Sequence, residues 1–345
     1  MTPKQKLQLI LKLSGLTQTQ LADRLGVTFV ALNRWINDKA APRPKALEKI
    51  DELYKEYSGE KQVPESVRAA KQGIIRGDQK KHPHVLKEIM DNPDIRDQFY
   101  LSLTYHSNRI EGSTLSEGET AAIMFQNAAL PNKDIIEQLE VKNHQAALGY
   151  LFEYMGEKKQ IDEALIMKLH GILLNAIRSD AGGYRNHGVR ITGSHVPTAN
   201  YVKVPDLMKA LIVNINEDAK DAINHIASIH ARFETIHPFG DGNGRIGRLL
   251  MSAMALRENL SPPVILQENR RLYITYLNNA QAKNDLTLLE DFTCDAILEG
   301  YNIVERGHSG EDIKEMTGVA KECGVNKKPD TSACPVVNNS TNPLI

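Results

Sequence analysis

Residues 237–248 read HPFGDGNGRIGR, a run that joins a histidine, an aspartate and an asparagine to closely spaced glycines and two arginines. The glycines at 240, 242 and 244 permit backbone angles that turn successive N–H groups inward around an anion. The apolar spacing of residues 246–256 predicts a helix directly after this loop, and a helix N-terminus favours negative charge. The run therefore predicts an anion site at a junction between a loop and a helix.

The two arginines make phosphate the expected anion. Arg245 and Arg248 are three residues apart and share one helical face, where planar guanidinium groups bind phosphate oxygens in pairs. A nucleotide-binding P-loop is excluded, because no Gly-Lys-Ser/Thr follows the glycines.

The run resembles the signature of the Fic family, His-x-Phe-x-(Asp/Glu)-Gly-Asn-Gly-Arg-x-x-Arg, at every specified position. Family members transfer AMP from ATP to a hydroxyl group, so the resemblance implies that His237 is the general base and that Asp241 holds Mg²⁺. It also implies that Arg245 binds the α- and β-phosphates and Arg248 the γ-phosphate. The ATP-binding residues implied in this run are Phe239, Gly240, Asp241, Gly242, Asn243, Gly244, Arg245 and Arg248.

A zinc site is the competing interpretation of this region. His225, His230 and His237 lie within a short stretch that ends close to Asp241. His225 and His230 are five residues apart and point to different helical faces, whereas zinc proteases place two ligands four residues apart. Metal-dependent hydrolysis is therefore the less favoured reaction.

An acidic residue further upstream points to regulation. Ser107 and Glu111 are four residues apart on one helical face, and Gly112 is a helix-ending residue. The segment resembles the inhibitory motif of the same family, Ser/Thr-x-x-x-Glu-Gly/Asn. The resemblance implies that Glu111 pairs with Arg248 and keeps it from the γ-phosphate. A surface glutamate at a helix end is the alternative.

A short β-hairpin is expected between the two motifs. Turn residues at 182–185 precede the alternating β-branched residues of 189–193, and Val196-Pro197 follows. An edge strand there would hold an extended target segment near His237, as a flap does in family members. An ordinary surface hairpin fits the same residues.

The segment from Arg271 to Gln281 resembles the family helix that lines the adenine pocket. Tyr273 would stack on the base and Gln281 would hydrogen-bond its edge. Ile274 departs from the pair of adjacent tyrosines common in relatives. The alternative places Tyr273 and Tyr276 in the core.

The N-terminal residues predict a second function. Residues 16–28 form a helix, a glycine turn and a new helix cap, and residues 29–37 continue as a helix. This pattern resembles the Xre-like helix-turn-helix of phage repressors, and residues 1–50 hold nine Lys/Arg against three Asp/Glu. The expected DNA contacts are Gln18, Thr28, Phe29, Val30, Arg34, Lys39 and Arg43. A helical docking module without DNA is the alternative.

Composition and periodicity divide the chain of 345 residues. The expected units are a helix-turn-helix domain at 1–57, a helical connector at 58–89, a Fic domain with its inhibitory helix at 90–305 and a loosely ordered tail at 306–345, with a short helix near 312–322. Three widely spaced cysteines, no membrane span and no signal peptide favour a reducing cytoplasm without a membrane partner.

The sequence thus predicts a mainly α fold: an all-helical core with one hairpin flap, joined to a small N-terminal bundle. The expected activity is protein adenylylation with ATP and Mg²⁺ on a Ser, Thr or Tyr hydroxyl of a target protein or of the chain itself, with reversal of the reaction and pairing between copies left open. Two alternatives remain: a related phosphotransferase, and a DNA-binding repressor whose Fic domain only senses nucleotide.

Overall fold

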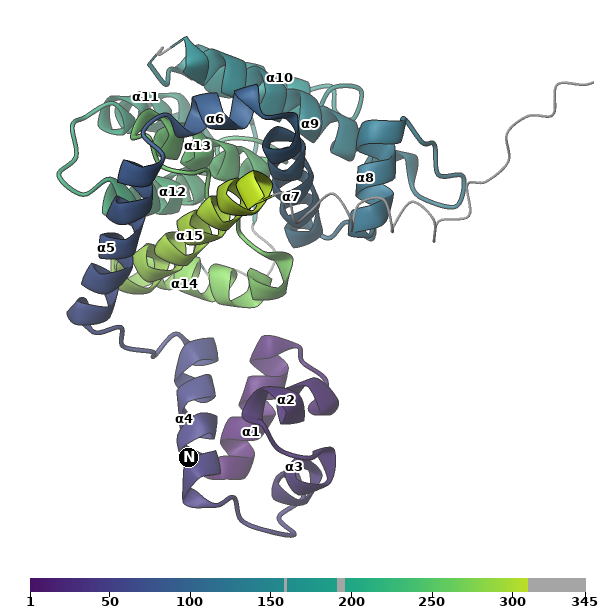
Figure 1. Cartoon of the computed structure of the whole chain (residues 1–345), viewed down its shortest axis with the longest axis vertical. Coiled ribbons are helices and arrows are strands. Elements are labelled where there is room, and N and C mark those ends of the chain that lie inside the picture. The colour runs from purple at the N-terminus through teal and green to yellow at the C-terminus, as the bar shows by residue number, and fades with distance from the viewer. Residues whose placement is uncertain (158–159, 191–195, 310–345) are drawn as a thin grey trace, which may run out of the picture.

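The computed structural model describes residues 1–157, 160–190 and 196–309, and every regular element within those ranges is helical (Figure 1). Two short 3-10 helices lie at Tyr201–Lys203 and Gln267–Asn269. The α-helices are α1 (Pro3–Ser14), α2 (Gln18–Leu25), α3 (Phe29–Ile36), α4 (Pro44–Ser58), α5 (Glu65–Lys81), α6 (Val85–Asp91), α7 (Pro93–Glu111), α8 (Glu117–Gln126), α9 (Ile135–Gly156), α10 (Glu163–Leu173), α11 (Val204–Ile215), α12 (Ala222–Ile236), α13 (Asn243–Arg257), α14 (Arg270–Lys283) and α15 (Thr287–Ser309). The mainly α fold predicted from the sequence is confirmed.

Helices α1 to α4 form the lower lobe of Figure 1 and have the expected helix-turn-helix geometry. The hydroxyl of Thr28 accepts a hydrogen bond from the backbone of Ala31 at 3.2 Å and so caps α3. Gly26 ends α2 with a φ of 69°, a left-handed angle that suits glycine. Leu32 and Trp35 bury the inner face of α3, which leaves its opposite face toward solvent.

The upper lobe is built around α13, whose residues 245–256 are all buried. Helices α7, α9, α10 and α12 pack around it, and α5 runs along α15 at the edge of the lobe (Figure 1). Because α13 follows the glycine run directly, this burial holds the start of the helix in place against four others. No described helix is both long and apolar enough to cross a bilayer.

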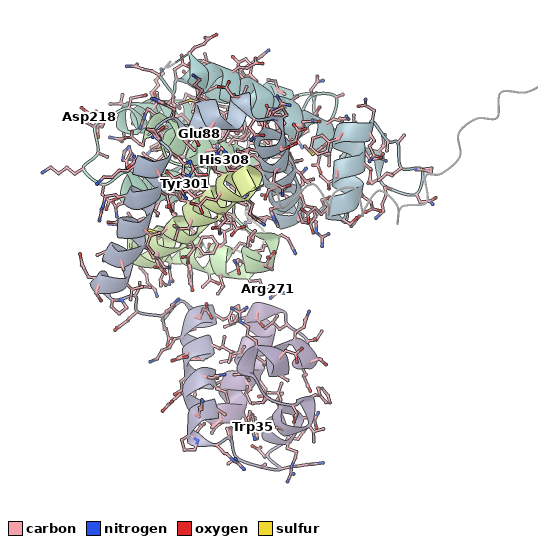
Figure 2. The ribbon with its side chains drawn as sticks, in the orientation of Figure 1. Trp35, Glu88, Asp218, Arg271, Tyr301 and His308 are labelled. Atoms are coloured by element: carbon pink, nitrogen blue, oxygen red, sulfur yellow. The ribbon has the colours of Figure 1, made fainter. Side chains whose placement is uncertain are left out.

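Helix α14 connects the two lobes. Figure 2 shows Arg271 at their junction, where its guanidinium donates to the carbonyls of Leu13 at 2.9 Å and Lys12 at 3.2 Å, at the end of α1. Asn279 donates to the carbonyl of Gly59 at 2.7 Å. A basic side chain at a helix C-terminus satisfies carbonyls that have no partner inside the helix.

Some expectations differ from the structure. Residues 182–190 and 196–199 contain no strand, and the centre of the expected hairpin, 191–195, lies outside the described residues. Helix α10 ends at Leu173, before the expected Ile177, because Ala176 takes a left-handed φ of 58°. The expected start of the tail at 306 falls inside α15, and the short helix expected near 312–322 lies outside the described residues.

Candidate active site

The loop between α12 and α13 and the start of α13 carry residues 237–248. His237 ends α12 with a φ of 51°, and Gly242 begins α13 with a φ of 77°. The carbonyl of His237 accepts a hydrogen bond from Nε of Arg185 at 2.7 Å. The same guanidinium donates to the carbonyls of His187 at 2.8 Å and Ala199 at 2.5 Å. Arg185, expected only as part of the flap, therefore fastens that region to the loop.

Two residues of the run brace the loop from inside. The side chain of Asn243 accepts from the backbone N–H of Phe239 and donates to its carbonyl, both at 2.9 Å. Phe239 is fully buried and stacks on His170, with ring centroids 3.8 Å apart. His170 Nε2 lies 3.2 Å from the carbonyl of Asp241. The side chains of Phe239 and Asn243 are therefore buried and stabilise the loop.

A buried acid lies beside the imidazole of His237. Glu234 precedes it by three residues on α12, and Oε2 of Glu234 lies 3.6 Å from Nδ1 of His237. Nδ1 is buried, while the whole His237 side chain is 17% exposed. A carboxylate on the Nδ1 side favours a proton there and leaves Nε2 as the basic atom. The sequence analysis missed Glu234, although its spacing from His237 was the available signal.

An acidic side chain just before α13 and a basic side chain in its first turn lie close together. Asp241 has a side chain that is 52% exposed, and its Oδ1 accepts from the backbone of Gly242 at 2.7 Å. Arg245 is only 3% exposed and lies 2.5 Å from Oε1 of Glu140 on α9. Its Nη2 lies 3.7 Å from Oδ1 of Asp241. Glu140 is a second residue that the sequence analysis missed, and no sequence pattern singled it out.

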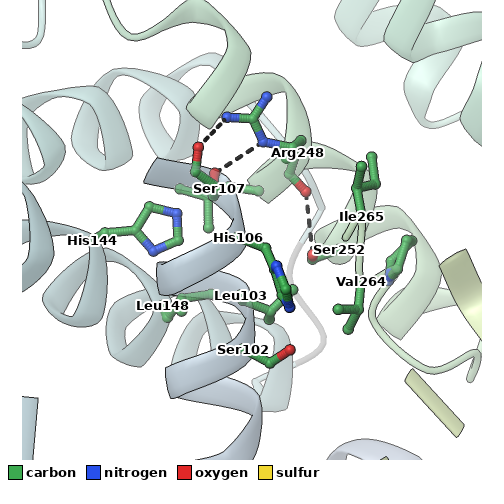
Figure 3. Close-up of a pocket in the computed structure, with 12 residues that line it drawn as sticks. Ser102, Leu103, His106, Ser107, His144, Leu148, Arg248, Ser252, Val264 and Ile265 are labelled. Carbon is green, nitrogen blue, oxygen red and sulfur yellow. Dashed lines mark hydrogen bonds between the residues drawn. The ribbon is translucent and has the colours of Figure 1, made fainter. Parts of the chain in front are cut away.

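Arg248 is buried under the end of α7, which brings the two sequence motifs together. Its Nε donates to Oγ of Ser107 at 2.9 Å and its Nη2 to Oε1 of Glu111 at 2.7 Å (Figure 3 shows Ser107 and Arg248). Burial opposes the charge on Glu111, but the charge and hydrogen bond of Arg248, helped by Arg245, lower the pKa of Glu111 below its ordinary value. The pair therefore stays ionised at neutral pH.

A small cavity lies behind this pair (Figure 3). Its volume is about 20 Å³, enough for about one water molecule. Ser107, His144 and Arg248 form its polar side, and Val264 and Ile265 line the apolar side. The cavity is too small to admit a nucleotide.

The expected adenine contacts lie in the core. Tyr273 is 3% exposed, and its hydroxyl lies 2.6 Å from Nε2 of His230. Its ring stacks near His230 and Phe292, with centroids 5.8 Å and 5.9 Å away. Gln281 is half-buried and donates to the carbonyl of Ala231 at 3.5 Å. Tyr273 is therefore buried in the core beside two other rings, and its stacking on adenine stays a prediction.

The zinc interpretation finds no support in the geometry. His230 faces Tyr273, and Nε2 of His225 lies 3.4 Å from the carbonyl of Ile215. Within the described ranges, the one group of three side chains with metal-ligand spacing lies elsewhere, at the end of α15.

The N-terminal lobe presents the residues expected to contact DNA. Phe29 and Val30, at the start of α3, are 46% and 65% exposed. Gln18 is half-buried and accepts from the amide of Asn33 at 3.4 Å, which links α2 to α3. Arg34, which is expected to read bases, is exposed, as are Lys39 and Arg43, which are expected at the DNA phosphates.

Each lobe contains a segment that matches a known protein family. Residues 160–255 match the model of the Fic/DOC family, and residues 7–60 match the model described as helix-turn-helix. The protein named Protein adenylyltransferase Fic from Nematostella vectensis is 32% identical over 240 residues, covering 66% of this chain and 55% of that protein. Protein adenylyltransferase fic-1 from Caenorhabditis briggsae is 30% identical over 261 residues, covering 72% and 50%. The chain thus spans about half the length of the curated relatives it matches.

A solved structure shares the fold. The Fic domain containing signaling protein from Bacteroides thetaiotaomicron superposes with a TM-score of 0.59 at 24% identity, covering 68% of this chain and 99% of that one. With the complete run at 237–248 and the two family matches, the chain belongs to the Fic/DOC family and carries a helix-turn-helix domain at its N-terminus.

Proposed function

We propose that the chain is a protein adenylyltransferase, which transfers AMP from ATP to a Ser, Thr or Tyr hydroxyl of a target protein or of itself. The observation that carries this proposal is the position of His237 beside the N-terminus of α13, from which Arg245 and Arg248 extend. The names of the relatives from Nematostella vectensis and Caenorhabditis briggsae support the same reaction.

His237 would begin the transfer as the general base. Its Nε2 accepts the proton of the hydroxyl, while Glu234 on the Nδ1 side stabilises the imidazolium that forms. The hydroxyl oxygen then bonds to the α-phosphorus of ATP, the bond to the bridging oxygen breaks, and pyrophosphate leaves. Because the nucleophile is a neutral hydroxyl, the base must lie next to the α-phosphate. The hydrogen bond from Arg185 to the carbonyl of His237 would hold the base in that position.

The start of α13 would bind the phosphates. The backbone N–H groups at 243 and 244 have no side-chain cap, since the N-cap residue, Gly242, has no side chain. The donors fit a magnesium ion, because Asp241 supplies one exposed carboxylate and leaves room for water and phosphate oxygens. Bound there, Mg²⁺ would neutralise charge that develops on the phosphates. Arg245 would bind the α- and β-phosphates and Arg248 the γ-phosphate.

We propose that Glu111 inhibits this reaction. Its carboxylate holds Nη2 of Arg248 at 2.7 Å and lies against Gly244, where a phosphate would meet the helix N-terminus. Release of Glu111 would free both the arginine and this space. The exposed part of Glu111 would also allow it to direct a water molecule at an adenylylated side chain, which is the reverse reaction. Pairing between copies through α7 is one way in which the state of Glu111 would be set.

Labelling with two forms of radioactive ATP tests the reaction. We expect label on protein from α-³²P ATP alone, and more of it in the Glu111→Gly variant. Label from γ-³²P ATP would identify a phosphotransferase instead. Absence of label from either form, even in Glu111→Gly, would favour a repressor that only senses nucleotide.

We also propose that residues 1–57 bind DNA, with 58–89 as the connector and a catalytic unit that begins at 90 and, because α15 continues to Ser309, ends beyond the expected 305. The exposed Phe29 and Val30 at the start of α3 are the specific observation in favour, since apolar side chains there suit contact with thymine methyl groups. Gel-shift measurements at two salt concentrations test this, because binding to phosphates weakens steeply as salt rises.

A further inference from the structure

Three potential metal ligands meet at the far edge of the upper lobe, where the end of α15 approaches the turn between α5 and α6. His82 follows α5, Glu88 lies on α6 and His308 lies in the last turn of α15. Figure 2 shows Glu88 and His308 close together near Tyr301. One ligand atom from each of the three residues lies within 4.8 Å of the others. No residue of this cluster belongs to the run at 237–248.

Two of the three spacings are close to those of a tetrahedral site, and the ligand atoms of the two histidines lie within 4.8 Å of each other. Nδ1 of His82 is 2.7 Å from Oε2 of Glu88, and Nε2 of His308 is 3.4 Å from the same oxygen. Ligands at the usual zinc distances of about 2.0 to 2.2 Å are separated from one another by roughly 3.3 Å. A bound ion therefore requires the His82 and Glu88 atoms to separate by only about half an ångström, a small side-chain adjustment.

The second nitrogen of His82, which would not bind the ion, is also in a position typical of metal-binding histidines. His82 has a side chain that is 6% exposed, and its Nε2 is buried without a hydrogen-bond partner. Oε1 of Glu305 lies 4.0 Å from this Nε2 and is held by Lys81 at 2.5 Å. A histidine that binds a metal through one nitrogen usually donates the other N–H to a carboxylate. Glu305 makes no hydrogen bond to Nε2 at this distance, and a side-chain shift on ion binding would bring it into range of that proton.

The turn that carries His82 is held in place without the ion. Asn259, just after α13, donates to the carbonyl of His82 at 3.1 Å and accepts from the backbone of Val85 at 3.2 Å. The ring of His82 also stacks near Tyr301, at a centroid distance of 6.0 Å. A ligand position fixed by its surroundings loses little entropy when the ion binds.

We propose that His82, Glu88 and His308 bind a divalent transition-metal ion of the zinc class, which fastens the end of α15 to the turn between α5 and α6. Two imidazoles and one carboxylate select such an ion over Mg²⁺, which prefers oxygen ligands alone. The fourth position is left to water, because His308 is 50% exposed. The role is structural, since the proposed phosphate site lies on other elements.

Equilibrium dialysis of the tag-free full chain against ZnCl₂, after EDTA treatment and without nucleotide, tests this site. We expect one zinc ion per chain and a rise in the melting temperature. The His308→Ala and Glu88→Gln variants should bind zinc at least about tenfold more weakly, and zinc should no longer raise their melting temperature. His308 and Glu88 are both partly exposed, so these variants should fold, which circular dichroism will verify.

Two further variants sharpen the test. His84→Ala removes an exposed histidine two residues from His82 and should bind zinc as the unaltered chain does. Glu305→Gln should keep one ion per chain with an affinity lowered by about tenfold. Equal zinc binding in the unaltered chain and His308→Ala would place the ion elsewhere and overturn the proposal. Absence of zinc binding in the unaltered chain would also overturn it, and His82 would then simply pair with Glu88.

Discussion

Gly244 and Glu111 approach each other so closely that any side chain at position 244 would overlap the Glu111 carboxylate. Glycine thus leaves an opening at the first turn of α13, and the acid from α7 occupies it. A carboxylate at a helix N-terminus is stabilised by the same N–H groups and dipole that favour phosphate. The proposed inhibitor and the proposed substrate therefore compete for one place.

Removal of the Glu111 carboxylate should release the proposed inhibition. In an assay with α-³²P ATP, we expect Glu111→Gly to raise adenylylation by about 5- to 150-fold. This range corresponds to the coupling free energies that are typical between two sites of a protein. Glu111→Gln, which keeps the shape and loses the charge, should give a smaller increase. The exposed Glu60 supplies a control, since Glu60→Gly should leave labelling unchanged. Equal labelling of all four proteins would remove Glu111 from regulation.

Substitution of His237 should separate chemistry from binding. In the Glu111→Gly background, His237→Ala should lower the transfer rate by about 10²- to 10⁴-fold, the usual contribution of a general base. Titration calorimetry with ATP should give an unchanged affinity, because the phosphate contacts lie in α13. A rate that survives this substitution would assign the base to another residue.

Glu234 is expected to act through His237 as a positioning residue. Its Oε2 lies 3.6 Å from Nδ1 of the imidazole. In the Glu111→Gly background, Glu234→Gln should lower kcat by about 10- to 100-fold, with KM for ATP unchanged, since a misplaced base costs rate and not nucleotide affinity. An equal rise in KM would instead indicate a distorted phosphate site. His225→Gln, on the same helix, is the control and should retain full activity.

Two buried histidines should make the fold sensitive to acid. Burial lowers the pKa of His144 to about 3, with help from the charges of Arg248 and Arg245, and lowers that of His230 to about 4. In the unfolded chain both take up protons near pH 6.5, so the unfolded state binds more protons below that pH. The free energy of unfolding should therefore fall by about 2 kcal/mol for each histidine between pH 7 and pH 5.

Urea unfolding at pH 7 and pH 5 measures this loss. His144→Gln should remove about half of the difference between the two pH values, whereas His84→Ala, which changes an exposed histidine, should leave it intact. The same pH dependence in His144→Gln as in the unaltered chain would show that other groups control it.

DNA binding, if the proposal holds, should depend on Arg34. Residues 1–50 carry nine Lys/Arg against three Asp/Glu, and Arg34 is exposed on α3. Arg34→Ala should weaken binding in gel shifts and reduce the slope of log K against log salt by about one. Glu52→Ala on α4 serves as the control. Affinity that does not change with salt would favour a docking module over a DNA-binding domain.

Much of the proposed site could be predicted because its residues are consecutive. The glycines, the acid and the arginines of 237–248 occupy a single loop and helix turn, so their relative positions follow from helix geometry. The cap at Thr28 and the left-handed Gly26 are likewise local, so the sequence alone predicts the turn between the two N-terminal helices.

The sequence by itself determined the helical class, the run proposed to bind phosphate and the acid at the end of α7, since each depends on neighbours a few residues apart. Only the tertiary structure decided that Glu140 pairs with Arg245, that Arg185 fastens the loop, and that Tyr273 is a core residue. Those contacts join residues from separate helices, and which faces meet depends on how all the helices pack together. The cluster at His82 and His308, more than 200 positions apart, arises in the same way.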